Sequence, residues 1–312
     1  MAEAVPAHEA QNRLRVRLSQ RAREEIVGYL CISPWILGFL VFTAGAMLFS
    51  LGLVFYKTDL LTGFKFVGLR NIVKMSRDPL FQKSLGVTSY YAFATVPLSL
   101  VIGLLIALGL NQGLWAQGLW RTLYYLPSVT SGIAVSMLWL WMFHPDAGLL
   151  NQALRMIGIE GPRWLYSERW AIPAFIIMGT WGAGGNMLLY LAGLQGIPTH
   201  LYEAARIDGA SSWRCFCVIT LPMLSPTIFF NLIMGIIGSF QVFTQALVMT
   251  NGGPNNATLT IMLYLYRKGF EQFQFGYASA IAWCLFFIVL LLTLLVLRSS
   301  AVWVYYEGEV RR

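Results

Sequence analysis

The chain has 312 residues, of which 57% are hydrophobic and only 12% are charged. Soluble globular domains carry about 25% charged residues, so this composition excludes an ordinary soluble domain and indicates an integral membrane protein. The net charge of +8 suits a chain that lies beside anionic lipid in a bilayer. In the absence of nucleic-acid-binding motifs, it does not indicate nucleic-acid binding.

Cysteine and histidine are too scattered to predict a disulfide framework or a metal site. No C-x-x-C spacing occurs, and three of the four cysteines lie in or near apolar runs. The three histidines are far apart in the sequence. We therefore expect no metal in this chain. The residues are Cys31, Cys215, Cys217, Cys284, His8, His144 and His200.

Six apolar segments are long enough to cross a membrane as helices, which requires about 20 residues each. We therefore predict an all-α polytopic membrane protein with six transmembrane helices and both termini on one side. Lys and Arg are divided equally between the two sets of loops, so charge asymmetry does not set the orientation. The basic leader weakly favours an internal N-terminus. The predicted spans are residues 28–56, 88–111, 122–142, 170–194, 223–250 and 275–300.

The six spans contain no Asp, Glu, Lys, Arg or His apart from Arg298 at the end of the last one. Ion-coupled carriers commonly place such groups at membrane depth, so their absence argues against ion coupling and favours an uncharged permeant. Neutral polar and aromatic side chains gather in the fourth and fifth spans. They either line a pathway for a hydroxylated molecule or hold helices together. They are Trp181, Asn186, Tyr190, Asn231, Ser239, Gln241, Thr244 and Gln245.

Glycine is concentrated in the fourth span, where four glycines occur within residues 179–185. Small residues allow helices to approach each other closely in lipid, which is the simplest explanation. Such a concentration also predicts a deformable or broken helix, as substrate-lining segments often have.

A polar stretch, residues 198–222, interrupts the apolar pattern between the fourth and fifth spans. Pro198 and Thr199 predict a helix start, and Gly209 predicts its end. Ser211 or Ser212 is expected to cap a second short helix, and Pro222 to open the fifth span. On the first helix, spacings of three and four place Leu201, Ala204, Ala205 and Asp208 on one thin face. This pattern predicts a helix–turn–helix outside the membrane that docks another protein; the alternative is an ordinary surface loop.

The same stretch carries the pattern E-A-A-x3-G-x9-I-x-L-P, from Glu203 to Pro222. It resembles the EAA signature of binding-protein-dependent ABC importer permeases. The segments "FVGLRNIVK", "TLYYLPSVTSGIAVSMLWLWMFHPDAGLLN" and "MTNGGPNNAT" are similar to the carbohydrate-uptake subfamily, in particular the first permease of maltose and glycerol-phosphate systems. The resemblance extends over roughly residues 25–300.

This resemblance implies a prokaryotic inner-membrane permease with a cytoplasmic EAA loop and both termini inside. It implies a cytoplasmic leader (1–27), a permease domain (28–300, with the EAA loop at 198–222) and a cytoplasmic tail (301–312). The implied partners are a second homologous permease, two copies of an ATPase and an extracytoplasmic sugar-binding protein. ATP and Mg would lie on the ATPase, since this chain has no G-x-x-x-x-G-K-[ST] loop.

The resemblance also assigns candidate sites. The cargo would be a mono- or oligosaccharide, or alternatively a polyol or a glycerol-phosphate-type solute; the segment "GSFQVFTQ" departs from the maltose pattern and speaks against maltose itself. An ion-coupled carrier and a membrane-embedded enzyme are the rival classes. ATPase coupling would use Glu203, Ala204, Ala205, Asp208, Gly209, Leu221 and Pro222. The substrate pathway would use Trp181, Asn186, Tyr190, Ser239, Gln241 and Gln245. The loop facing the binding protein would contain Asn251, Gly252, Gly253 and Pro254.

Overall fold

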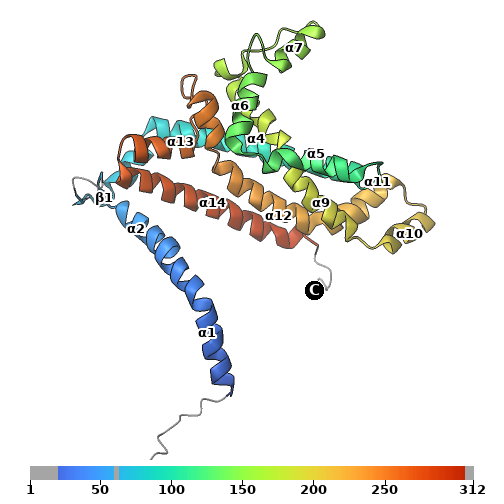
Figure 1. Ribbon diagram of the computed structural model, residues 1–312, viewed down its shortest axis with the longest axis horizontal. Helices are drawn as coiled ribbons and strands as arrows, with labels where there is room; N and C mark the ends of the chain where they lie inside the picture. Colours follow the sequence, from blue (N-terminus) through green and yellow to red (C-terminus); the bar gives the residue numbers. More distant parts are fainter. Residues whose placement is uncertain (1–19, 60–62, 306–312) are drawn as a thin grey trace, which may run out of the picture. The chain divides into compact units, whose positions relative to one another are not determined.

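The computed structural model describes residues 20–59 and 63–305, except for the side chain of Ala22 (Figure 1). The chain divides into two units, residues 1–52 and 53–312. Most of the predicted leader and the end of the predicted tail lie outside the described residues.

The first unit is one helical run. It consists of α1 (Gln20–Gly38), a wider helical turn η1 (Phe39–Gly45) and most of α2 (Ala46–Leu53). Pro34 lies inside α1, where its missing N–H leaves one carbonyl of the preceding turn without its helical donor. Most large apolar side chains of the first unit are exposed, as expected of a helix that faces lipid.

The second unit is mostly helical and carries one very short hairpin, so the expectation of an all-α chain needs a small correction. Tyr56 pairs with Phe66 and Lys57 with Lys65 in antiparallel register. The elements are β1 (Tyr56–Lys57), β2 (Lys65–Phe66), α3 (Arg70–Ser76), α4 (Pro79–Leu110), α5 (Gln117–Val129), α6 (Gly132–Met142), α7 (Leu149–Met156), η2 (Trp164–Tyr166), α8 (Ala171–Trp181), α9 (Gly184–Gln195), α10 (Thr199–Ile207), α11 (Ser212–Cys215), η3 (Phe216–Thr220), α12 (Leu221–Phe240), η4 (Ala246–Thr250), α13 (Ile261–Tyr266), η5 (Arg267–Glu271) and α14 (Phe275–Trp303).

Within the described residues, four helices are long and apolar enough to cross a membrane, and up to six if each of two bent pairs is one crossing. The α8–α9 pair bends by 40°, so the prediction of a deformable or broken fourth helix is confirmed. The α5–α6 pair bends by 98°, which the sequence did not predict. The fifth predicted span is also interrupted, because α12 ends at Phe240 rather than continuing to residue 250.

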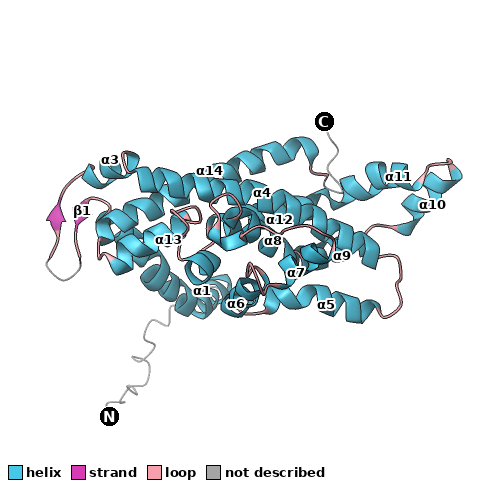
Figure 2. Cartoon of the chain, turned by 90° about the horizontal axis from the view of Figure 1, so that it is seen from above, coloured by secondary structure: helices cyan, strands magenta, loops and turns pink. Residues whose placement is uncertain are grey.

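The long helix α4 is the centre of the second unit, and α8, α9, α12 and α13 pack against it. Helix α12 in turn packs against α14 (Figures 1 and 2). The larger apolar core joins α4, α8, α13 and α14 and contains Phe143, Phe175 and Ile281. A smaller core joins the end of α4 to α9 and the start of α12, around Met187 and Leu224.

A polar cluster fixes the start of α4. Asp78 is the N-cap residue, and its side chain accepts a hydrogen bond from the N–H of Leu80 at 3.0 Å. Its second carboxylate oxygen accepts from the hydroxyls of Tyr264 and Tyr277, the latter at 2.6 Å. Burial alone raises the pKa of Asp78, but these hydrogen bonds favour the carboxylate more strongly and hold that pKa below its usual range.

The β1–β2 hairpin and α10 lie at opposite ends of the second unit in both views (Figures 1 and 2). Helices α4, α12 and α14 connect these two ends. The functional residues therefore divide into those at the α10 end, those between the helices and those at the hairpin end.

Candidate functional site

The α10 end is shaped by a defined helix stop. Pro198 is the N-cap residue with extended backbone, and Thr199 begins the helix as predicted. At the other end, the N–H of Ala210 donates to the carbonyl of Ala205 at 2.9 Å, and the N–H of Gly209 donates to that of Arg206 at 3.0 Å. This pair of bonds is a Schellman motif, which needs a left-handed residue, and Gly209 supplies it with φ of 73°.

One side of α10 is anchored and the other is open. Leu201 and Tyr202 pack against the smaller core, and the Tyr202 hydroxyl lies 2.9 Å from Thr220 Oγ1 in a hydrogen bond. Glu203 and Ala204 are exposed, and Ile207 is 87% exposed. The open side of α10 therefore presents an acidic, a small and an apolar side chain next to one another.

The predicted thin face of α10 needs a correction. Leu201 packs inward and Ala205 is half-buried, whereas Ala204 and Asp208 are exposed. The two alanines therefore do not form one open ridge. Ile207 was not among the predicted site residues, although its place four residues after Glu203 puts it on the same helix face.

The predicted second short helix is also different. Ser211 is the N-cap residue as predicted, and its Oγ accepts a hydrogen bond from the N–H of Arg214 at 3.3 Å. The helix that it caps is not short, however, because α11, η3 and α12 form one helical run from Ser212 to Phe240. Leu221 and Pro222 lie in the first turn of α12. They are therefore part of this long helix and not of the turn that ends α10.

A cavity of about 340 Å³ lies between α4, the α8–α9 break and the end of α12. Four of the six predicted pathway residues line it, namely Asn186, Ser239, Gln241 and Gln245. Gly103 of α4 makes this arrangement possible, because a Cβ there would approach the Asn186 Cβ to 3.0 Å and the Ala183 carbonyl to 3.2 Å. The break at Gln241, where α12 ends, brings backbone and amide groups to the cavity.

The two other predicted pathway residues do not line this cavity. Trp181 is 43% exposed and makes an edge contact with Trp139, with ring centroids 5.8 Å apart. Tyr190 is 1% exposed and belongs to the smaller core.

Asn231 joins the cavity from α12. It is 1% exposed and lies beside the Tyr190 hydroxyl, but its Nδ2 makes no hydrogen bond of ordinary geometry among the described residues. A buried amide donor without a partner costs free energy unless a ligand or water completes it. Asn231 is one of the polar residues of the fifth span but was not among the predicted site residues. Its position two helical turns before Ser239 was the signal that could have identified it.

The chemistry of this cavity is uncharged. Amides, hydroxyls and one tyrosine line it, and among the described lining residues there is no Asp, Glu, Lys, Arg or His. Side-chain amides both donate and accept hydrogen bonds, as a hydroxylated neutral ligand requires. The cavity can thus bind and orient such a molecule.

The predicted external loop is held in place by its own hydrogen bonds. Asn251 and Gly252 have left-handed backbones, with φ of 43° and 78°. Arg267 Nη2 donates to the Asn251 carbonyl at 2.6 Å, and Thr258 Oγ1 donates to the Gly253 carbonyl at 2.8 Å. Gly252 is buried, whereas Asn251 is exposed and Gly253 and Pro254 are half-buried. The loop is therefore an ordered continuation of the segment that lines the cavity.

A sequence profile of the family described as "Binding-protein-dependent transport system inner membrane component" matches residues 99–303. The chain belongs to this family. Its members are transport subunits, the permeases of ABC transporters. The chain is 42% identical to the probable ABC transporter permease protein YesP of Bacillus subtilis, over 92% of this chain and 94% of the relative. It is 38% identical to the lactose transport system permease protein LacF of Rhizobium radiobacter, over 89% of this chain and 95% of that protein.

The permease fold also matches a solved structure. A chain of a bacterial alginate ABC transporter, solved in complex with an alginate pentasaccharide-bound periplasmic protein, superimposes with a TM-score of 0.79. The alignment covers 91% of this permease and 97% of that chain, at 24% sequence identity. At this identity the likeness establishes the fold.

Proposed function

We propose that the chain is one of two transmembrane permease subunits of an ATP-driven importer, and that it forms half of the pathway for a sugar. The observation that carries this proposal is the uncharged cavity of Asn186, Asn231, Ser239, Gln241 and Gln245 inside a permease fold. The relative named as a lactose permease supports a saccharide as cargo.

In this proposal the chain crosses a prokaryotic inner membrane six times, with the α5–α6 and α8–α9 pairs each counted as one crossing. The α10 loop is cytoplasmic, and so are the leader (1–27) and the tail (301–312). The hairpin end then faces outward, because α4, α12 and α14 separate it from α10.

Energy in this proposal comes from two copies of a cytoplasmic ATPase, which hold ATP and Mg. The exposed face of α10 docks onto the ATPase, and Gly209 fixes the turn that follows it. This face carries Glu203, Ala204, Ile207 and Asp208. Closure of the ATPases moves α10, and the hydrogen bond between Tyr202 and Thr220 transmits this movement to the long helical run that begins at Ser212. A second permease completes the pathway, and an extracytoplasmic binding protein delivers the sugar.

The coupling role is tested by reconstituting the complete transporter in proteoliposomes. Replacing Glu203 by Ala is expected to abolish ATP-driven uptake while membrane insertion is unchanged. Glu160→Ala, which removes another exposed acid, is the matched control. Normal uptake by the Glu203 variant would refute the docking role of α10.

The alternative cargo is a polyol or a glycerol-phosphate-type solute. An anionic cargo needs a cation on its path, and none of the described residues around the central cavity is Lys or Arg. Comparing uptake of a disaccharide, a polyol and glycerol phosphate separates these cargos. Uptake of glycerol phosphate alone would refute the sugar assignment.

A further inference from the structure

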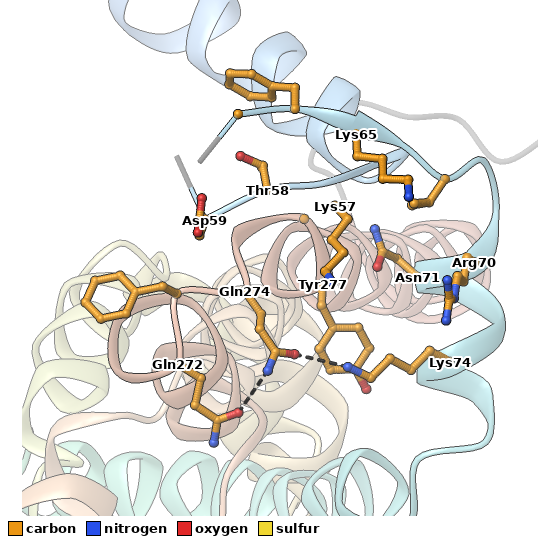
Figure 3. A pocket seen from close by; sticks show the side chains of 15 residues that line it. Lys57, Thr58, Asp59, Lys65, Arg70, Asn71, Lys74, Gln272, Gln274 and Tyr277 are labelled. Carbon is orange, nitrogen blue, oxygen red and sulfur yellow. Dashed lines mark hydrogen bonds between the residues drawn. The ribbon is translucent and has the colours of Figure 1, made fainter. Parts of the chain in front are cut away.

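A second and larger cavity, of about 760 Å³, lies at the hairpin end of the second unit. The hairpin, helix α3 and the segment that leads into α14 form its walls (Figure 3). It is separate from the central cavity, since the two share no lining residue.

This outer cavity is strongly basic. Lys57, Lys65, Arg70 and Lys74 border the same space, and Asp59 is the one acid among the described lining residues (Figure 3). Within the described part of the chain, no carboxylate lies within ion-pair distance of these four cations. Burial and the nearby charge of Lys268 lower the pKa of Lys74 by more than the attraction of Asp78 raises it, and Arg70 and Lys57 act in the same direction as Lys268.

Hydrogen bonds and close packing hold α3 and the start of α14 against the chain that enters the hairpin. Asn71 Nδ2 donates to the carbonyls of Val54 and Tyr56, at 2.8 and 3.0 Å, which ties α3 to the chain entering the hairpin. Gly276 lets the first turn of α14 lie against this chain, since a Cβ there would stand 1.9 Å from the Tyr56 carbonyl oxygen. Lys74 Nζ donates to Gln274 Oε1 at 3.0 Å and lies 4.4 Å from the centre of the Tyr277 ring.

Aromatic side chains border the cavity beside the cations. Phe64 and Phe273 are 55% and 52% exposed. Phe273 has φ of 54°, a left-handed conformation that non-glycine residues seldom adopt. Arg70 and these two aromatic rings belong to the residue types that are enriched at protein–protein interfaces, whereas lysine is depleted there. An anionic lipid headgroup would need only the cations.

The two cavities differ in charge, and this difference identifies the class of ligand. A permeant anion would meet cations along its path, but the described lining of the central cavity has none. An anion attracted to the outer cavity would therefore not be the cargo.

We propose that the outer cavity is a docking site for the binding protein, which inserts a carboxylate-bearing segment between Arg70 and Lys74 while Phe64 and Phe273 pack around it. This proposal rests on the importer function above. It assigns the contact to the hairpin, α3 and the start of α14, in addition to the loop at residues 251–254.

The test uses the complete transporter in nanodiscs and measures ATP hydrolysis as a function of binding-protein concentration. The double variant Arg70→Gln, Lys74→Gln is expected to raise the half-maximal concentration about 5- to 10-fold, with the maximal rate unchanged, because exposed interfacial charges act mainly on association. The salt dependence of this concentration should become shallower. Arg77→Gln, which removes an exposed charge at the end of α3 outside the cavity, should leave both unchanged.

Other outcomes separate the alternatives. If the binding protein stimulates the wild-type transporter and the double variant equally, the docking site is refuted while the importer function stands. If it stimulates neither, the importer function itself fails. An effect of the double variant that disappears in nanodiscs without anionic lipid would assign the cavity to a lipid headgroup and overturn the proposal. An effect only on the maximal rate, with the half-maximal concentration unchanged, would also overturn it.

Discussion

Substitutions at Gly209 test the shape of the α10 turn directly. A Cβ at this position meets no atom within 4 Å, so any penalty is conformational rather than steric. With φ of 73°, Ala is expected to cost about 1–2 kcal/mol, whereas Asn, which tolerates the left-handed region better, should cost less. The β-branched Val should cost the most.

Amide hydrogen exchange measures this cost where it arises. The N–H of Ala210, which donates to the Ala205 carbonyl, should lose about 5- to 30-fold protection in Gly209→Ala. ATP-driven uptake should fall in the same order, Asn, then Ala, then Val. Gly109→Ala is the control, since Gly109 lies in α4 with ordinary helical φ and open space around it. Equal effects of Asn, Ala and Val at position 209 would refute the conformational reasoning.

The remaining predictions concern the packing at Gly184, the hydrogen bonds of Asp78 and the central cavity. Gly184→Ala should destabilise the protein by about 1–3 kcal/mol, because the added Cβ would lie 1.8 Å from a carbonyl oxygen of α5. Gly185→Ala is the control and should not destabilise it, because the nearest atom to its Cβ would be 3.7 Å away. Thermal melting of both variants in detergent checks this prediction. The lowered pKa of Asp78 stabilises the folded protein above about pH 4, and this stabilisation is lost as the pH falls further. Asp78→Asn should therefore make the melting temperature depend less on pH on the acid side. An unchanged pH profile would contradict this prediction. Tyr264→Phe, which removes one hydrogen bond to that carboxylate, should shift the acid side toward higher pH. Gln241→Ala should change the KM for sugar uptake without weakening ATPase binding, and unchanged kinetics with every sugar tested would remove it from the pathway.

Local chemistry in the sequence predicted the α10 region well up to Gly209. Pro198 and Gly209 restrict the backbone only locally, so the start of the helix and the left-handed residue that ends it could be inferred directly from the sequence. Pro222 lies in the first turn of α12 as predicted, but the helical run that contains it already begins at Ser212, so the fifth span starts earlier than the sequence predicted.

Tertiary features were harder to infer. The polar residues of the fourth and fifth spans were known, but which ones face the cavity depends on breaks at Gly182 and Gln241 that rotate the following segments. Tyr190 packs in the smaller core and does not line the central cavity, because an aromatic side chain in a span serves a core as readily as a pathway; its pathway role stays a prediction. The outer basic cavity was missed, since it brings Arg70 and Gln274 together from segments about 200 residues apart.

A photo-crosslinking amino acid at Ile207, the most exposed apolar residue of α10, tests the central claim most directly. The transporter would be assembled with its second permease, ATPase and binding protein, and irradiated with and without ATP. We predict that the residue crosslinks to the ATPase and that ATP changes the yield. Crosslinks to the binding protein, or to lipid alone, would contradict the account.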